Sequence, residues 1–433
     1  MEKNEKDRAN VLSTGQHNPI MSLPRLSKGA NILYFNIQQR QLFINPSLRK
    51  RIVEGGAGAG KTLLCLLKSI EITRSDDSND NVMIFAPFPH TIRCTRFLKA
   101  NGVDVLNESE FPPVLERHSK SVVYVYDLDQ VLNVCPVNVS SMKPHHIFFD
   151  DAQSVFRKAD ADDFEKWKRV QSLFADLHQH SKNNKRLYAW FCLDKFQTCP
   201  NSGVLPWMTI NKDMDGKSLG INGLPKVFKL DSIMRNAAPI IKHMLVDVQL
   251  LSTVHDQEEE NHYSVGHSIN GPGIEYHVLI YPGHIQSCLP TVGNYMSSTL
   301  SKLLKMYPTI DIAVLYDDDD FTESSSWSNV IKSLDEKVLS IQESIESDNT
   351  NCRKVIVDKA INVASFECPI VIVICSDPGC PNLEDVAKIY TLTSRGRSKL
   401  IVVPLVQADS YFGLNIEYIK VLHPQVVFNV TTL

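Results

Sequence analysis

Short apolar runs alternate with stretches of helical periodicity along almost the whole chain. The runs expected to form strands in the first half are Arg51–Glu54, Val82–Ala86, Val122–Tyr126, His146–Phe149 and Leu187–Leu193. A second series comprises Val227–Leu230, Ile274–Tyr281, Asp311–Tyr316, Lys354–Val357, Ile370–Cys375 and Lys399–Val403. Helical patterns lie between them, at Lys61–Thr73, Phe164–His178, Asn236–Val248, Leu289–Met306 and Asn382–Leu392. Strands that alternate with helices predict parallel sheets with crossover connections, so the expected fold class is α/β.

A change in composition near the middle of the chain indicates how the domains are organised. The stretch Thr198–Pro225 is rich in Gly, Pro, Asn and Asp and has no clear period, which is typical of an interdomain connection. We therefore predict two α/β domains of similar size, at residues 29–200 and 226–405, joined by a linker at 201–225. Residues 1–28 are polar and lack the apolar core of a signal peptide, so a disordered tail is expected there. Residues 406–433 are expected to form a C-terminal extension.

Composition and charge exclude several classes of protein. The formal net charge of -4 argues against a surface coated with basic side chains, although it leaves room for a local basic groove. The 10 cysteines are scattered and form no CxxC pair, which predicts reduced, buried thiols instead of a disulfide framework or a zinc site. No apolar run reaches the length of a membrane span. We expect an intracellular protein, cytoplasmic or nuclear, that does not contact a membrane.

The strongest motif is VEGGAGAGKTLL, which begins at Val53. It fits the phosphate-binding loop pattern G-x4-G-K-[ST] without a mismatch, with an expected strand before it and a helix after it. The strand and helix disfavour the simpler interpretation, a glycine-rich turn. Lys61 can reach the β and γ phosphates of a nucleotide and Thr62 can hold Mg²⁺, while backbone N–H groups surround the phosphates. The predicted nucleotide-binding residues of the loop are Gly55, Gly56, Ala57, Gly58, Ala59, Gly60, Lys61 and Thr62.

A second motif, IFFDDAQ, ends a short apolar run with two adjacent carboxylates. An acidic pair after an apolar run is by itself most often a solvated turn. Downstream of a phosphate-binding loop, however, two carboxylates at the end of a strand suit two separate roles. Asp150 would hold Mg²⁺ through water, and Asp151 would orient or deprotonate the attacking water.

The order and spacing of the surrounding motifs resemble a superfamily 1 helicase core. In FNIQQRQLF (Phe35–Phe43), Gln39 falls at the glutamine that reads adenine in that superfamily, although a polar helix face is the alternative. DDAQ resembles the DEAQ box, in which Gln153 would link the nucleotide site to the neighbouring domain. LYAWFCLDKFQT resembles the third motif, in which Asp194 and Gln197 would sense the γ-phosphate.

Three further motifs fall in the second predicted domain. KLDSIMRNAAPIIKHM resembles the fourth motif and offers Arg235 as an arginine finger. INVASFECPIVIVI resembles the fifth, with Glu367 suited to the ribose, and IYTLTSRGRSKLIVV resembles the sixth, with Arg395 as a second finger. The resemblance implies two RecA-like domains with the nucleotide site in the cleft between them. It also implies ATP and Mg²⁺ as cofactors and guanidinium groups that stabilise charge on the γ-phosphoryl.

Two of these runs point to a particular family within the superfamily. FCLDKFQT followed by RNAAPIIK resembles the C-terminal helicase-like domain of the longer Schlafen proteins, over about Asn31 to Leu405. The endoribonuclease-like Schlafen core has no counterpart in this sequence, so RNA cleavage is not implied. The expected function is an ATP-binding and ATP-hydrolysing helicase-like protein that acts on single-stranded RNA or DNA, with a protein partner as a further option.

The sequence departs from the helicase pattern at three places. Asp151 stands where the helicase box usually has Glu, and a shorter side chain predicts slow hydrolysis because misplacement by about 1 Å can cost roughly a hundredfold in rate. Ser365 occupies a position of the fifth motif that is normally Gly. The chain also lacks room for the large domain insertions that strand-separating helicases of this superfamily carry. Phe196 and Trp207 could stack on bases but fit core packing better. These departures favour an alternative, a nucleotide-gated binding module with little turnover and no unwinding.

Overall fold

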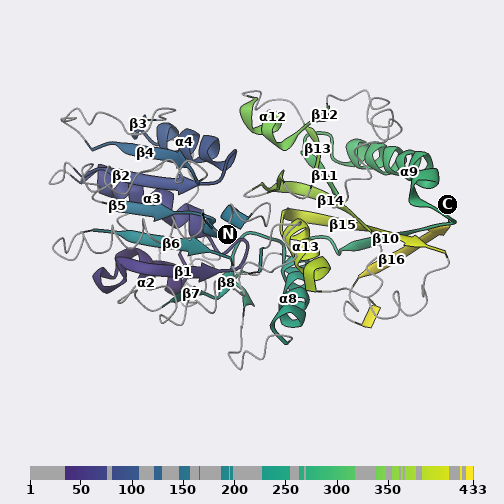
Figure 1. Cartoon of the computed structure of the whole chain (residues 1–433), viewed down its shortest axis with the longest axis horizontal. Coiled ribbons are helices and arrows are strands. Elements are labelled where there is room, and N and C mark those ends of the chain that lie inside the picture. The colour runs from purple at the N-terminus through teal and green to yellow at the C-terminus, as the bar shows by residue number, and fades with distance from the viewer. Residues whose placement is uncertain are drawn as a thin grey trace, which may run out of the picture. The chain divides into compact units, whose positions relative to one another are not determined.

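The computed structural model describes residues 35–75, 80–106, 121–128, 146–156, 165, 187–194, 196–197, 227–253, 263–267, 270–316, 338–347, 354–359, 362–363, 366–376, 383–408, 420–421 and 426–432. The chain divides into two compact units. The described residues of the first unit lie within 35–155, at 165, and within 187–194 and 227–232, and those of the second lie at 156, at 196–197 and within 233–432. Figure 1 labels the elements of both.

The first unit is built on a seven-stranded sheet in which every pairing is parallel. Its strand order is β3-β4-β2-β5-β6-β1-β7. The strands are β1 (Lys50–Gly55), β2 (Val82–Ala86), β3 (Val105–Leu106), β4 (Val123–Asp127), β5 (His146–Phe149), β6 (Ala189–Leu193) and β7 (Phe228–Leu230). Parallel strands bring their carboxyl ends to one edge of the sheet, so residues that follow different strands meet there.

Helices α2 (Ile37–Ile44), α3 (Lys61–Thr73) and α4 (His90–Ala100) contribute to the core of this unit. Leu64 and Leu67 of α3, together with Leu98 of α4, pack against alternate strand residues such as Ile84 and Phe148. Alternation follows from the two-residue period of a strand, which turns every second side chain toward the same helices. This packing fixes α3, and with it the loop that precedes α3, against the sheet.

The second unit contains another seven-stranded, all-parallel sheet, with the order β12-β13-β11-β14-β15-β10-β16. Its strands are β10 (Glu275–Tyr281), β11 (Ile312–Tyr316), β12 (Val338–Leu339), β13 (Val355–Lys359), β14 (Cys368–Ser376), β15 (Gly396–Gln407) and β16 (Val427–Thr432). Helix α9 (Ile285–Met306) forms a core with β10, β11, β14 and β15. Helices α8 (Ala238–Thr253) and α13 (Leu383–Thr393) pack against each other beside β14 and β15 (Figure 1).

The predicted α/β class with two parallel-sheet domains is confirmed. Two assignments differ in detail from the sequence pattern. The run Val227–Leu230 was grouped with the second series, but β7 pairs with β1 and belongs to the first sheet. Residues 427–432 of the predicted C-terminal extension form β16, which pairs with β10 at the edge of the second sheet.

The described part of the chain bears on two further expectations. All six cysteines in it, Cys65, Cys94, Cys192, Cys288, Cys368 and Cys375, are free and buried, as predicted. Among the described residues, no helix combines the length and apolar character needed to cross a membrane. Most of the expected helix Phe164–His178 lies outside the described residues.

Candidate nucleotide-binding site

The phosphate-binding loop joins β1 to α3, as its sequence predicts. Gly58 and Gly60 have φ values of 82° and 90°, in the left-handed region that only glycine adopts without strain. A Cβ atom on Gly60 would lie 2.8 Å from Nε2 of Gln39, so a side chain at this position would also have to displace that amide. The Leu64 N–H donates to the carbonyl of Gly60, which starts the helix directly after the loop.

Lys61 is buried within its own loop. Its ammonium group donates to the carbonyl of Gly55 at 2.6 Å and to that of Gly56 at 3.1 Å. The side chain is 6% exposed, and Thr62 next to it is partly buried. The positive charge is therefore held among the turns of the loop, where a phosphate group would also be bound.

Gln39 lies under the loop instead of on a polar helix face, although its role with adenine stays a prediction. It is 5% exposed, and its Nε2 donates to the carbonyl of Ala59 at 2.8 Å. Its Oε1 accepts from the backbone N–H of Asn36, while the Asn36 side chain accepts from the N–H of Gln39. This capping box fixes the first turn of α2 and ties that helix to the loop.

The strand order brings the candidate carboxylates to the same sheet edge as the loop. β6 lies between β1 and β5, and Glu54 is in register with Leu193 while Phe149 is in register with Phe191. Asp194 directly follows β6 and Asp150 directly follows β5, so both lie at the carboxyl edge of the sheet. Asp194 is fully buried, and Asp150 is 1% exposed.

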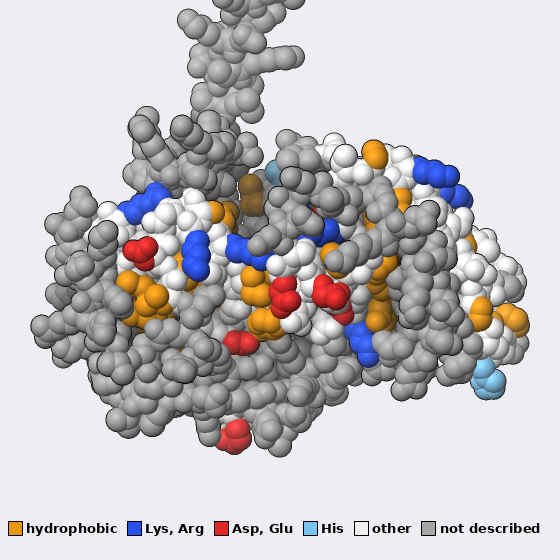
Figure 2. Space-filling view, turned by 90° about the horizontal axis from the view of Figure 1, so that it is seen from above, with side chains coloured by type: hydrophobic (Ala, Val, Ile, Leu, Met, Phe, Trp, Pro, Cys, Tyr) orange, Lys and Arg blue, Asp and Glu red, His pale blue; other side chains and the backbone are white. Residues whose placement is uncertain are grey.

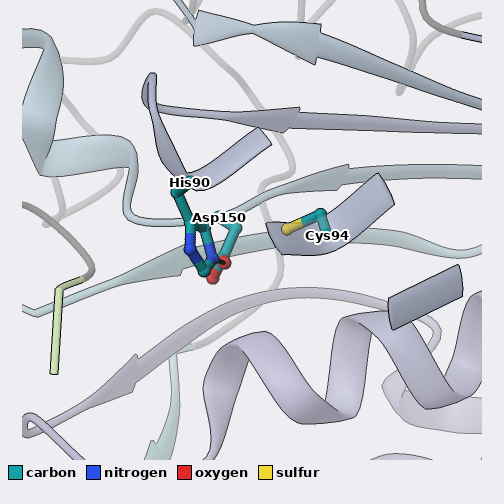
Figure 3. Close-up of side chains that lie close together, drawn as sticks. All are labelled: His90, Cys94 and Asp150. Atoms are coloured by element: carbon teal, nitrogen blue, oxygen red, sulfur yellow. Dashed lines mark hydrogen bonds and ion pairs between the residues drawn. The ribbon is translucent and has the colours of Figure 1, made fainter. Parts of the chain in front are cut away.

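Asp150 contacts a residue that the sequence did not single out. Its Oδ2 lies 3.1 Å from Nε2 of His90, at the start of α4, while its Oδ1 is buried without a hydrogen-bond partner in the described structure (Figure 3). Burial tends to lower the pKa of His90, but the neighbouring Cys94 and Asp150 outweigh it and raise this pKa well above its usual value. The surroundings of His90 therefore favour a positive charge.

The backbone conformation of Asp151 explains why an aspartate occupies this position. Its φ of 49° is left-handed, a conformation in which Asp and Asn are several-fold enriched among residues other than glycine. The Ser154 N–H and hydroxyl both donate to the Asp151 carbonyl, at 2.9 and 2.7 Å, which holds the turn. An aspartate in place of the usual glutamate therefore suits this turn.

Gln153 connects the second and third motifs within the first unit. Its Nε2 lies 3.4 Å from Oδ1 of Asp151, and its Oε1 accepts from the N–H of Asp194 at 3.1 Å. The amide thus spans the ends of β5 and β6 and orients the Asp151 carboxylate. Its predicted link to the neighbouring domain stays a prediction.

These residues fit a magnesium nucleotide. A buried carboxylate oxygen without a partner costs about 1–3 kcal/mol, and a hydrated cation facing Asp150 Oδ1 would remove that cost. Thr62 and Asp150 could hold such an ion, while the loop backbone and Lys61 could bind phosphates. The first unit by itself therefore offers groups that suit phosphates and groups that suit a metal ion.

The predicted residues of the second unit gather at the turn between α13 and β15. Arg235 forms an ion pair with Glu367 and donates to the carbonyl of Ser394. Arg395 is 2% exposed, and its Nε donates to the carbonyl of Thr391 at 2.9 Å. The fourth, fifth and sixth motifs thus meet in one place within the second unit.

Asn236 supports this cluster and was not predicted. It is fully buried, and its Nδ2 donates to the carbonyls of Ser394 and Gly396, at 2.9 and 2.6 Å. Its only sequence signal is a position directly after Arg235. The two hydrogen bonds hold the segment that carries Arg395.

The remaining candidate residues lie elsewhere. Phe196 is 2% exposed and packs edge-on against the rings of Tyr263 and Tyr390, so it is part of the core, as expected, and is not available to stack on bases. Gln197 belongs to the second unit together with Phe196. Trp207 and Ser365 lie outside the described residues.

The exposed charges of the described residues are mixed. The face drawn in Figure 2 exposes both Lys or Arg side chains and Asp or Glu side chains. The view agrees with the formal net charge of -4 and shows no continuous basic stripe among the residues drawn in colour.

Comparisons with solved structures identify the fold. The chain superimposes on the DUF1998 helicase MrfA bound to DNA with a TM-score of 0.55 and 12% identity, over 96% of this chain and 56% of that one. The DEAD-box helicase Mss116 bound to ssRNA and UDP-BeF gives 0.54 and 11%, over 92% and 75% of the two chains. Dbp5 of S. cerevisiae, bound to RNA and ADP BeF3, gives 0.50 and 12%, over 92% and 89%.

Sequence comparisons add no family. No protein-family model matches the chain, and no curated protein matches it. At 11–12% identity, the structural likeness shows the fold alone. The chain therefore has a helicase-like P-loop fold made of two parallel-sheet domains.

Proposed function

We propose that the chain is a Mg²⁺-dependent ATPase with a helicase-like, Schlafen-like core that acts on single-stranded RNA or DNA. The observation that carries the proposal is one sheet edge that holds both the buried Lys61 of the loop and the buried Asp150, which has an unpaired oxygen. Phosphoryl transfer needs a positively charged group that binds phosphates and a negatively charged group that binds the metal ion, and the Lys61 ammonium and the Asp150 carboxylate would supply them. The similar structures are bound to RNA or DNA, two of them also to a nucleotide analogue, and this supports the proposal.

Within the first unit, the proposed roles follow from the contacts. Lys61 would exchange its two carbonyl partners for phosphate oxygens, and Thr62 and Asp150 would hold Mg²⁺, which neutralises phosphate charge when bound. Asp151 would orient the attacking water, with Gln153 fixing the carboxylate. Gln39 would bind adenine while it supports the loop through Ala59.

The second unit would contribute positive charge. Arg235 and Arg395 are assigned to the charge that develops on the γ-phosphoryl group, and Glu367 to the ribose. Because Arg235 is paired with Glu367, this assignment requires that ion pair to open when nucleotide is bound. Substituting Arg235 by Ala should therefore lower kcat more than it weakens nucleotide binding.

The experiment that tests the proposal is ATP hydrolysis by the purified chain, with and without single-stranded RNA and DNA. Lys61→Ala should abolish turnover and weaken nucleotide binding. Lys99→Ala is the matched control, because Lys99 is an exposed lysine at the end of α4 in the same unit. Equal ATP affinity in the wild type and Lys61→Ala would disprove the site.

A nucleotide-gated binding module is the second candidate, and one observation favours it. Asp151 is both shorter than the usual glutamate and set in a left-handed turn, so a slow hydrolytic step is expected. Nucleotide would then change affinity for RNA, DNA or a protein partner with little turnover. ATP-dependent partner binding without polymer-stimulated hydrolysis would favour this candidate over the motor.

A further inference from the structure

Three chemically different side chains converge beside the sheet edge of the first unit. His90 and Cys94 are one turn apart on α4, so both lie on the same helix face. Asp150 follows β5, which pairs with the strand that precedes α4. Figure 3 shows that the His90 imidazole and the Asp150 carboxylate lie together, with the Cys94 sulfur pointing toward them.

The spacing of these side chains is close to that of a metal site. One donor atom from each residue lies within 4.8 Å of the others, and His90 Nε2 is 3.1 Å from Asp150 Oδ2. Bonds of about 2.0–2.3 Å in tetrahedral geometry place donor atoms roughly 3.3–3.7 Å apart. The nitrogen and oxygen, 3.1 Å apart, would have to separate by a few tenths of an ångström, and the sulfur, at most 4.8 Å from them, would have to move closer by about 1 Å, which is within reach of a side-chain rotation.

Burial and charge also suit a cation. The three residues are 8%, 1% and 1% exposed, and the second Asp150 oxygen has no partner in the described structure. Cys94 would lose its proton on binding, as thiol ligands do.

We propose that His90, Cys94 and Asp150 form a binding site for Zn²⁺ or a cation of similar softness. A nitrogen, a thiolate sulfur and a carboxylate oxygen are a donor set that Zn²⁺ accepts, whereas Mg²⁺ prefers oxygen alone. The sequence contains no zinc motif at regular spacing, because two ligands come from one helix and the third from the end of a distant strand.

The site has a consequence for the first unit, because Asp150 would serve two metals. A Zn²⁺ ion held with His90 and Cys94 would occupy the carboxylate that the proposed ATPase needs for Mg²⁺. Zn²⁺ should therefore inhibit hydrolysis. This inhibition rests on the proposed ATPase function, whereas the binding of Zn²⁺ does not.

Binding is tested with Co²⁺, a spectroscopic substitute for Zn²⁺, added to the metal-free full chain. We expect a thiolate-to-metal charge-transfer band that saturates at one equivalent and is displaced by Zn²⁺. Cys94→Ser should abolish the band and weaken Zn²⁺ binding in calorimetry by at least about tenfold. Cys288→Ser, the same substitution at a buried cysteine of the second unit, should keep both.

His90→Gln gives a second variant in case Cys94→Ser does not fold, and it should also weaken Co²⁺ binding. A Co²⁺ spectrum that Cys94→Ser leaves unchanged, or an absence of binding, would overturn the proposal whether or not the chain hydrolyses ATP. If the chain is an ATPase, Zn²⁺ at fixed Mg²⁺ should inhibit the wild type and spare Cys94→Ser. Equal inhibition of both would refute the shared use of Asp150.

Discussion

Gly60→Ala probes how the loop and the adenine-reading helix depend on each other. Gly60 has a φ of 90°, and a Cβ there would lie 2.8 Å from the Gln39 amide nitrogen. Gly102 offers a matched control, because its φ is 73° but a Cβ there would meet nothing within 4 Å. The two substitutions share the backbone strain and differ in the collision.

The magnitudes can be worked from these contacts. A left-handed alanine costs about 1–2 kcal/mol, partly offset by about 0.4–1 kcal/mol because alanine restricts the unfolded chain. Gly102→Ala should therefore lose between about 0 and 1.6 kcal/mol. Gly60→Ala must also displace the Gln39 amide from Ala59, which adds about 1–3 kcal/mol for a lost hydrogen bond and a buried amide.

Hydrogen exchange of the α3 amides in increasing urea measures the stability of the first unit directly. We expect Gly60→Ala to lose about 1–3 kcal/mol more than Gly102→Ala. Gly60→Ala should cost less in a Gln39→Ala background than in the wild type, since the collision is then absent. Equal losses in the two glycine variants, or an equal cost of Gly60→Ala in both backgrounds, would refute the reasoning.

Three further predictions concern other parts of the molecule. Glutamate adopts the left-handed backbone less readily than Asp or Asn. Asp151→Glu should therefore lower the stability of the first unit by about 1 kcal/mol in thermal unfolding, whereas Asp151→Asn should not. Equal melting temperatures of the two variants would contradict this prediction. Asn236→Ala should cost the second unit about 1–3 kcal/mol in denaturant unfolding because it removes two buried hydrogen bonds, whereas the exposed Asn294→Ala should be neutral. Burial would raise the pKa of Glu275, but the hydrogen bonds and charges of Lys399 and His277 outweigh burial and lower this pKa. The ionised Glu275 therefore stabilises the fold above the ordinary pKa of 4.5, and this stabilisation is lost as the pH falls below that value. Acid titration of stability should show a smaller loss below pH 4.5 in Lys399→Met, and an unchanged profile would count against the pair.

The agreement between sequence and structure is best where a feature is local. The helix Lys61–Thr73 and the strands Val82–Ala86 and His146–Phe149 have the predicted bounds, because their apolar periods are regular and their ends are sharply marked. Helix α4 is amphipathic but was not among the predicted elements. It begins after Pro89 with polar residues and has few strongly apolar side chains, so neither the helix nor the two residues that it brings to Asp150 stood out in the sequence.

The chain by itself determined the phosphate-binding loop, since its glycines, lysine and flanking elements are consecutive and need only local backbone geometry. The sequence also determined that strands and helices alternate, which fixes an α/β class. The tertiary structure alone decided which distant residues meet. His90 and Asp150 are 60 positions apart, and Arg235 and Glu367 are 132 apart. Such pairs depend on strand order, which long-range packing of many apolar side chains selects and no single motif records.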